Sequence, residues 1–180
     1  NPFNFNIPPR QIFYGLQSRD EMGDLTLQVL TKNESDRLKL KRHYAEKWIK
    51  QEISGYQMLT KTNPGNSEYQ HTLAMLYMQT RQFKKATSHF LHSINTKPDY
   101  SEARVNFAIL LMRNGDSEKA REQLILALKS NPDYANAHFN LGLLLHNSGE
   151  EMEAKHHFEE AALLRPEMEQ AIKRQIARLK

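Results

Sequence analysis

Four prolines set the length of a repeating unit in this chain. Pro64, Pro98, Pro132 and Pro166 follow one another at a constant spacing of 34 residues. A fixed period of this length is typical of architectures in which small units stack side by side, each too small to bury its own apolar face. The period therefore predicts a solenoid across this part of the chain.

The residues between the prolines repeat with the same period. Blocks 67–100, 101–134 and 135–168 place small or apolar residues at matching offsets, namely Leu73, Ala74, Tyr77, Ala86, Phe90 and Ser93, then Phe107, Ala108, Leu111, Ala120, Leu124 and Ala127, then Leu141, Gly142, Leu145, Ala154, Phe158 and Ala161. Small residues at the eighth and twentieth positions of a block allow two helices to approach closely, and the larger residues nearby fill the space around that contact. Each block therefore predicts a pair of packed helices.

Turn-forming residues separate the predicted helices. Asn114-Gly115-Asp116 and Asn147-Ser148-Gly149 lie near the middle of their blocks, where Gly or Asn can adopt the left-handed conformation that ends a helix. The second helix of each block ends before the proline, which cannot continue it.

These blocks resemble tetratricopeptide repeats (TPRs). The resemblance implies an all-α, right-handed superhelix of antiparallel helix pairs, with repeats at 67–100, 101–134 and 135–168. Residues 169–180 then predict a C-terminal solvating helix with a basic end.

The segment 31–66 matches the repeat only partly. Pro64 is in phase, but Lys39, Leu40 and His43 stand where Leu, Gly and Tyr are expected. We predict one long helix or a broken pair over 31–62, acting as an N-terminal cap or degenerate repeat whose apolar side, including Trp48, covers the first full repeat.

Composition excludes some classes of protein. The chain has 26% charged residues, no cysteine, and no apolar run of the roughly 18 residues that a bilayer-spanning helix needs. Its net charge of +4 comes from an excess of basic residues in 32–62, which also contains acids and lacks aromatic interleaving. This pattern favours a solvated helix face over a nucleic-acid site.

Residues 1–30 differ from the rest and predict an extended, irregular arm with short strand-like runs. The segment from Tyr14 to Leu25 resembles the Gly-x-x-Ser-x-Asp-Glu-Met segment of copper type II, ascorbate-dependent monooxygenases. That resemblance implies that Met22 is a copper ligand and that a catalytic core lies upstream of Asn1, because no histidine precedes Met22. Alternatively, the arm packs on the repeats or on a partner.

The start at Asn1 rather than Met also suggests a processed chain or a piece of a longer one.

The TPR resemblance places the first helix of each pair on the inside of the superhelix. Candidate partner-binding residues in that groove are His71, Met75, Met78, Glu102, Asn106, Ile109, Arg113, Asn136, Phe139, Asn140, Leu143, His146 and Asn147, with Glu68, Thr72, Gln79, Val105 and Met112 at the same offsets. Methionine adapts to irregular partners, and asparagine can bond a peptide backbone.

Two features of the groove bear on the partner. Asn106 and Asn140 share an offset, which resembles the asparagine ladder of some peptide-binding TPR proteins, although asparagine there can also simply stabilise the repeat. The carboxylate clamp of chaperone-binding TPR domains is not reproduced: its offsets hold His71, Met75, Asn106, Asn136 and Asn140, and only Asn106 matches. A terminal carboxylate therefore has no fixed cation to meet.

The sequence gives little support for a metal site or an active site. His89 and His92 are three residues apart and His156 and His157 are adjacent, but neither pair has a recognisable third ligand. No phosphate-binding glycine loop, nucleophile elbow or cysteine nucleophile occurs. We therefore expect no independent active site and no cofactor.

The sequence predicts a scaffold that binds a protein partner, as a peptide in the groove or as a subunit of a larger assembly. The alternatives are the C-terminal appendage of a copper-dependent monooxygenase, and a permanent structural subunit. Copper is expected only in the first alternative, and the preference for a periplasmic location rests on the copper resemblance alone.

Overall fold

In the computed structural model, residues 34–177 are described, and within them the chain is helical with no strand. The predicted arm and Met22 lie outside the described residues. The chain forms two compact units, 1–50 and 51–180. The first described helix, α2 (Glu34–Thr62), begins in the first unit and ends in the second.

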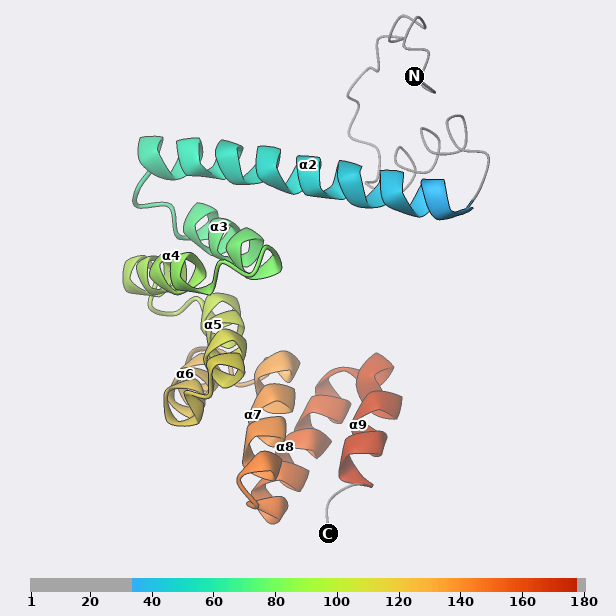
Figure 1. The fold of residues 1–180 in the computed structure, drawn as a ribbon. Helices are drawn as coiled ribbons and strands as arrows, with labels where there is room; N and C mark the ends of the chain where they lie inside the picture. Colours follow the sequence, from blue (N-terminus) through green and yellow to red (C-terminus); the bar gives the residue numbers. More distant parts are fainter. Residues whose placement is uncertain (1–33, 178–180) are drawn as a thin grey trace, which may run out of the picture. The chain divides into compact units, whose positions relative to one another are not determined.

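Three antiparallel helix pairs make up most of the second unit (Figure 1). They are α3 (Ser67–Gln79) with α4 (Phe83–Thr96), α5 (Ser101–Asn114) with α6 (Ser117–Ser130), and α7 (Ala135–Asn147) with α8 (Glu151–Leu164). The short 3-10 helix η1 (Pro166–Met168) and α9 (Glu169–Ile176) follow. This arrangement confirms the all-α fold of paired helices.

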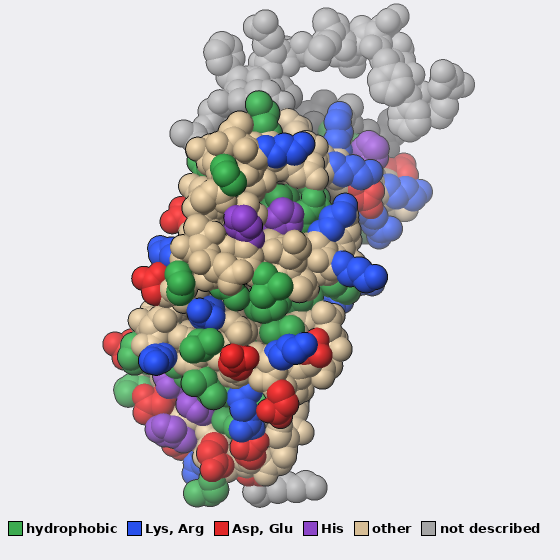
Figure 2. Space-filling view, turned by 90° about the vertical axis from the view of Figure 1, so that its left-hand side faces the viewer, with side chains coloured by type: hydrophobic (Ala, Val, Ile, Leu, Met, Phe, Trp, Pro, Cys, Tyr) green, Lys and Arg blue, Asp and Glu red, His purple; other side chains and the backbone are tan. Residues whose placement is uncertain are grey.

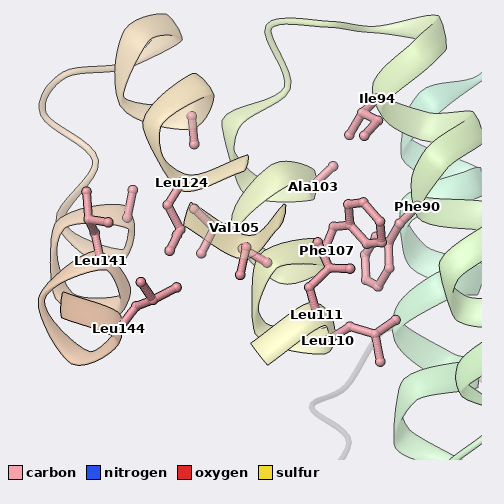
Figure 3. Close-up of a cluster of buried hydrophobic side chains, with 14 of the residues drawn as sticks. Phe90, Ile94, Ala103, Val105, Phe107, Leu110, Leu111, Leu124, Leu141 and Leu144 are labelled. Carbon is pink, nitrogen blue, oxygen red and sulfur yellow. The ribbon is translucent and has the colours of Figure 1, made fainter. Parts of the chain in front are cut away.

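The core is built from the residues that repeat in the sequence. All eighteen residues named above at the matching offsets of the three blocks are buried. Phe90 and Phe107 lie against each other with their ring centroids 5.9 Å apart, and the core continues through Leu124 and Leu141 into the next pair (Figure 3). Stacking therefore buries one continuous core, as the period predicts.

Close packing within a pair depends on the small residue at the eighth position. A Cβ added to Gly142 would lie 2.8 Å from two ring atoms of the buried Phe158 and 3.2 Å from the carbonyl oxygen of Ala154. The predicted close approach of the two helices is therefore present in the third pair.

The turns inside the three pairs are equivalent. Gly115 and Gly149 adopt left-handed φ values of 86° and 82°, and Arg81 takes the same position in the first pair with a φ of 59°. In each turn this residue donates its backbone N–H to a carbonyl three residues earlier, on Met78, Met112 and His146 respectively. Arginine thus adopts a conformation that favours glycine.

We predict that Arg81→Gly raises the free energy of unfolding by about 0.5–1 kcal/mol, because it relieves the cost of a left-handed arginine while the turn's hydrogen bonds remain. Urea unfolding followed by circular dichroism measures this change. The reciprocal variant Gly115→Arg should lose about 1 kcal/mol. A loss of stability in Arg81→Gly would contradict the interpretation.

The segment 34–62 forms one continuous helix rather than a broken pair. Trp48 lies in the first unit and is 42% exposed, and its role in covering the first full repeat stays a prediction. Within the second unit, Ile53 and Tyr56 pack against the core, and Thr60 is buried. Gln57 also donates a 2.7 Å hydrogen bond to the Tyr77 hydroxyl. The last part of α2 therefore packs against the core.

At the other end of the second unit, α9 buries Ile172 completely and packs Ile176 against the core. Lys173 and Arg174 lie in its last turn, where positive charge is favourable beside the helix dipole. Among the described helices, none is long and apolar enough to cross a bilayer.

Candidate functional site

The first helices of the pairs share one face of the second unit. α5 contacts both α3 and α7, so the residues at matching offsets on these three helices form a continuous surface. We call this surface the inner face and define it by the groove candidates on α3, α5 and α7 named in the sequence analysis.

The inner-face candidates differ in how far they reach solvent. Glu102, Arg113 and Asn147 are exposed and Met75 is 36% exposed. His71 is only 7% exposed, so it lies beneath the surface. The remaining candidates are half-buried, namely Met78, Asn106, Ile109, Asn136, Phe139, Asn140, Leu143 and His146. The surface is therefore amphipathic, with apolar side chains between amides.

His71 connects the first two repeats beneath this surface. Its Nδ1 lies 3.2 Å from the Tyr100 hydroxyl, and its Nε2 lies 2.9 Å from the side-chain amide nitrogen of Asn106. Burial lowers the pKa of His71, against the opposing effect of Glu102, so the ring is neutral at pH 7. An amide nitrogen can only donate, so Nε2 accepts from Asn106 and the Nδ1–H donates to Tyr100.

Asn136 and Asn140 are also held by neighbours. The Asn140 amide donates to the backbone carbonyl of Asn136 at 2.7 Å. The Asn136 side-chain oxygen accepts a 3.0 Å hydrogen bond from Arg165, which follows α8. The amides on the inner face are therefore oriented before any partner binds.

Arg113 and His146 lie at the opposite end of the inner helices from Glu102. The Arg113 guanidinium lies 4.7 Å above the Phe83 ring, a cation–π contact. His146 Nδ1 lies 3.1 Å from the carboxylate of Glu151. Both side chains are thus engaged within the fold.

A polar bracket that the sequence analysis missed repeats in all three pairs. In each bracket, the side chain of the fourth residue of the block makes two contacts. One is with the backbone carbonyl of the repeated proline that precedes the block, and the other is with the side chain of the twenty-third residue of the same block. The side-chain pairs are Gln70 with His89 at 2.7 Å, Arg104 with Gln123 at 2.7 Å, and His138 with His157 at 2.9 Å. The contacts with the carbonyls of Pro64, Pro98 and Pro132 measure 3.5, 2.8 and 2.9 Å. Each bracket ties the two helices of a pair to the turn before them.

These brackets also contain two of the four histidines considered as metal ligands, His89 and His157. His89 contacts Gln70, while His92 Nε2 lies 3.0 Å from the Pro64 carbonyl, so the two rings contact different groups. Within residues 34–177, no group of three or more histidine, aspartate or glutamate side chains is arranged to hold a metal ion.

The outer face carries a second apolar feature. On the side of α4 and α6, hydrophobic side chains gather in the middle of the surface among charges of both signs (Figure 2). Leu91 and Ile125, at equivalent positions of these helices, are 43% and 51% exposed. An open depression beside Leu91 has Phe107 and Leu111 in its lining and Lys119 and Glu122 among its polar residues.

The stacked helix pairs and repeated turns define an α-solenoid protein. Models of the TPR match residues 67–100 and 135–173, and a further TPR model matches residues 110–149. Together these matches cover more than half of the chain, which therefore belongs to the tetratricopeptide repeat proteins. They give no support to the copper monooxygenase resemblance of residues 14–25.

Solved structures share this fold. A crystal structure of MamA aligns with a TM-score of 0.61 and 22% identity over 69% of this chain and 68% of that chain. A MamA AMB-1 structure aligns at 0.63 and 24% identity over 76% and 80%. The first TPR of Spaghetti (RPAP3), bound to an HSP90 peptide, aligns at 0.60 and 17% identity over 63% and 91%. No curated protein matches the chain.

Proposed function

We propose that this protein is an interaction scaffold whose inner face binds an extended segment of a partner protein. The observation that carries the proposal is the combination on one face of half-buried apolar side chains with amides held in fixed orientations. Binding of this kind requires no catalytic residue, and the proposal includes no cofactor.

The apolar part of the inner face supplies contact area. Met75, Met78 and Ile109 lie on α3 and α5, and Phe139 and Leu143 continue the set on α7. Methionine side chains adapt to irregular surfaces, and the rigid aromatic ring of Phe139 can anchor a partner at low entropic cost. Fixed amides between these side chains can pair with a peptide backbone without selecting its sequence.

The RPAP3 repeat domain was solved with the HSP90 peptide SRMEEVD, which ends in acidic residues and a terminal carboxylate. In this chain the residue at the first clamp offset, His71, is buried and neutral, and the Asn106 amide nitrogen is engaged with it. These observations support a partner other than an acidic carboxyl-terminal tail.

A second candidate function is that of a subunit in a larger assembly that docks through the outer face. The exposed Leu91 and Ile125 and the depression beside Leu91 favour it. We do not propose the enzymatic alternative. A periplasmic location stays a prediction.

Capture of partner proteins with the immobilised chain tests the inner-face proposal. The double variant Asn106→Ala/Asn140→Ala removes both amides and should weaken capture about tenfold or more, since each lost hydrogen bond leaves a partner group unpaired. The matched control Leu91→Ala/Ile125→Ala should retain capture. Circular dichroism checks that both variants fold. The opposite pattern would favour docking through the outer face and contradict the proposal.

A further inference from the structure

Asn106 and Asn140 have their side-chain nitrogens engaged within the fold, whereas the Asn136 oxygen already accepts from Arg165. Asn140 donates to the carbonyl of Asn136, and because a carbonyl can only accept, the nitrogen of Asn140 is turned toward its own helix. Asn106, at the same offset one repeat earlier, directs its nitrogen to Nε2 of the neutral His71. Each side-chain oxygen is then on the opposite side of its amide from that contact and is available to accept from a partner.

Two exposed carboxylates occupy equivalent positions on the neighbouring helices α3 and α5. Glu68 and Glu102 share an offset on α3 and α5, both are exposed, and neither has an ion pair with any residue in the described range. Both act on Tyr100, whose pKa burial and these carboxylates raise to about 12, and Glu102 also acts on His71. Both carboxylates are therefore close enough to Tyr100, which contacts His71 in the His71–Asn106 network, to act on it.

One cation lies near this network: Lys97 Nζ is 5.1 Å from the centroid of the Tyr100 ring and offsets part of the charge of the two carboxylates. Two arginines on α5 are directed elsewhere. Arg113 lies near the other end of α5 and packs over Phe83. Arg104 is directed to the Pro98 carbonyl and Gln123 inside its bracket. This part of the inner face therefore combines negative charge with hydrogen-bond acceptors, a combination that repels carboxylates and attracts donors.

We propose that the inner face selects an internal, extended segment that carries lysine or arginine. A basic side chain of the partner binds between Glu68 and Glu102, and backbone N–H groups of the segment donate to the side-chain oxygens of Asn106 and Asn140. His71 acts as a positioning residue that fixes the orientation of the Asn106 amide. This inference rests on the proposed function and specifies the chemistry of the partner.

Fluorescence anisotropy with two labelled, amidated peptides tests the charge preference. Both peptides share one leucine and alanine framework, and one carries lysines where the other carries glutamates. The lysine peptide should bind about tenfold more tightly at low salt, because attraction to Glu68 and Glu102 replaces repulsion. Glutamate binding equal to or tighter than lysine binding would overturn the inference and leave the scaffold function intact.

Variants assign the preference to these residues. Glu68→Gln/Glu102→Gln should weaken the lysine peptide about fivefold and remove most of the difference between the peptides. Glu122→Gln, the same substitution on the outer face, should change neither affinity. A lysine preference that survives in the double variant would overturn the proposed site.

The side-chain NH₂ resonances of Asn106 test whether His71 positions the Asn106 amide. His71→Leu removes the acceptor for Asn106, so the side-chain NH₂ resonances of Asn106 should shift and lysine-peptide binding should weaken severalfold. His71→Gln supplies another acceptor and should restore both signals. If His71→Leu leaves the Asn106 resonances unchanged, His71 does not position that amide.

Absence of binding by either peptide would overturn the inference. The capture experiment with Asn106→Ala/Asn140→Ala then decides separately whether the scaffold function fails as well. The two failures are therefore distinguishable.

Discussion

Replacing Phe90 with alanine should lower the free energy of unfolding by about 3–5 kcal/mol. Phe90 is fully buried, and its ring lies 5.9 Å from both the Phe107 and His71 rings, so it joins the first helix pair to the second. The cavity would open at the junction on which two repeats depend. Urea unfolding of the whole chain, monitored by circular dichroism, measures the loss.

Leu91 provides the matched control, since it is the next residue on α4 and is 43% exposed. Leu91→Ala should change stability by about 0.5 kcal/mol or less. If the two variants lost similar stability, the continuous core through Phe90 and Phe107 would not be the main source of cohesion between these repeats.

Acidification should destabilise the third repeat through the His138–His157 bracket. Burial, followed by the neighbouring His138 and His156, lowers the pKa of His157 from 6.5 to about 4, with Glu160 acting in the opposite direction. Between these values the unfolded chain binds more protons than the folded chain. Stability from this group is therefore fully present above about pH 6.5 and decreases as the pH falls toward about 4. Because the ring is half-buried, we expect a loss of about 1–2 kcal/mol across this window.

His157→Gln provides the test, because glutamine already occupies this offset in the second repeat as Gln123. The variant should reduce the loss of stability between pH 6.5 and 4, as measured by urea unfolding at each pH. His156→Gln, at the exposed neighbouring position, should leave most of the loss in place. A pH dependence unchanged in His157→Gln would show that the bracket is not the acid-sensitive element. Part of the dependence should persist in every variant, because burial also lowers the pKa values of His71 and His89.

The core could be predicted from the sequence because it depends on contacts that recur with the period. Leu73, Phe107 and Leu141 share an offset and are all buried, as are Ala86, Ala120 and Ala154. Similarity at one offset is visible in the sequence without knowledge of which side chain touches which. The same reasoning correctly placed glycine in the turns at Gly115 and Gly149.

The polar contacts could not be predicted in this way. The bracket joins Gln to His, Arg to Gln and His to His, so neither of its offsets holds the same residue type in all three repeats. Its residues are far apart along the chain and meet only when the helices pair. The sequence did not predict the burial of His71 for a related reason. Its partners are distant along the chain: Tyr100 ends the same block, and Asn106 lies on α5 in the next one.

The N-terminal boundary was predicted only in part. Helical spacing suggested a long helix, and α2 is continuous over Glu34–Thr62. Apolar periodicity gives Tyr44 and Trp48 the same spacing as Ile53 and Tyr56, so it does not show which of them pack on the core. In the second unit, Ile53 and Tyr56 do so. Tyr44 and Trp48 lie in the first unit and are 44% and 42% exposed.

The inner face of α3, α5 and α7 is the proposed binding surface. Chemical-shift mapping of the isotope-labelled chain with a captured partner, or with the lysine peptide, locates the bound molecule on the chain. We predict that the largest shifts fall on Asn106, Ile109, Asn140 and Leu143. Shifts concentrated instead on Leu91, Lys119 and Ile125 of the outer helices would contradict the proposal.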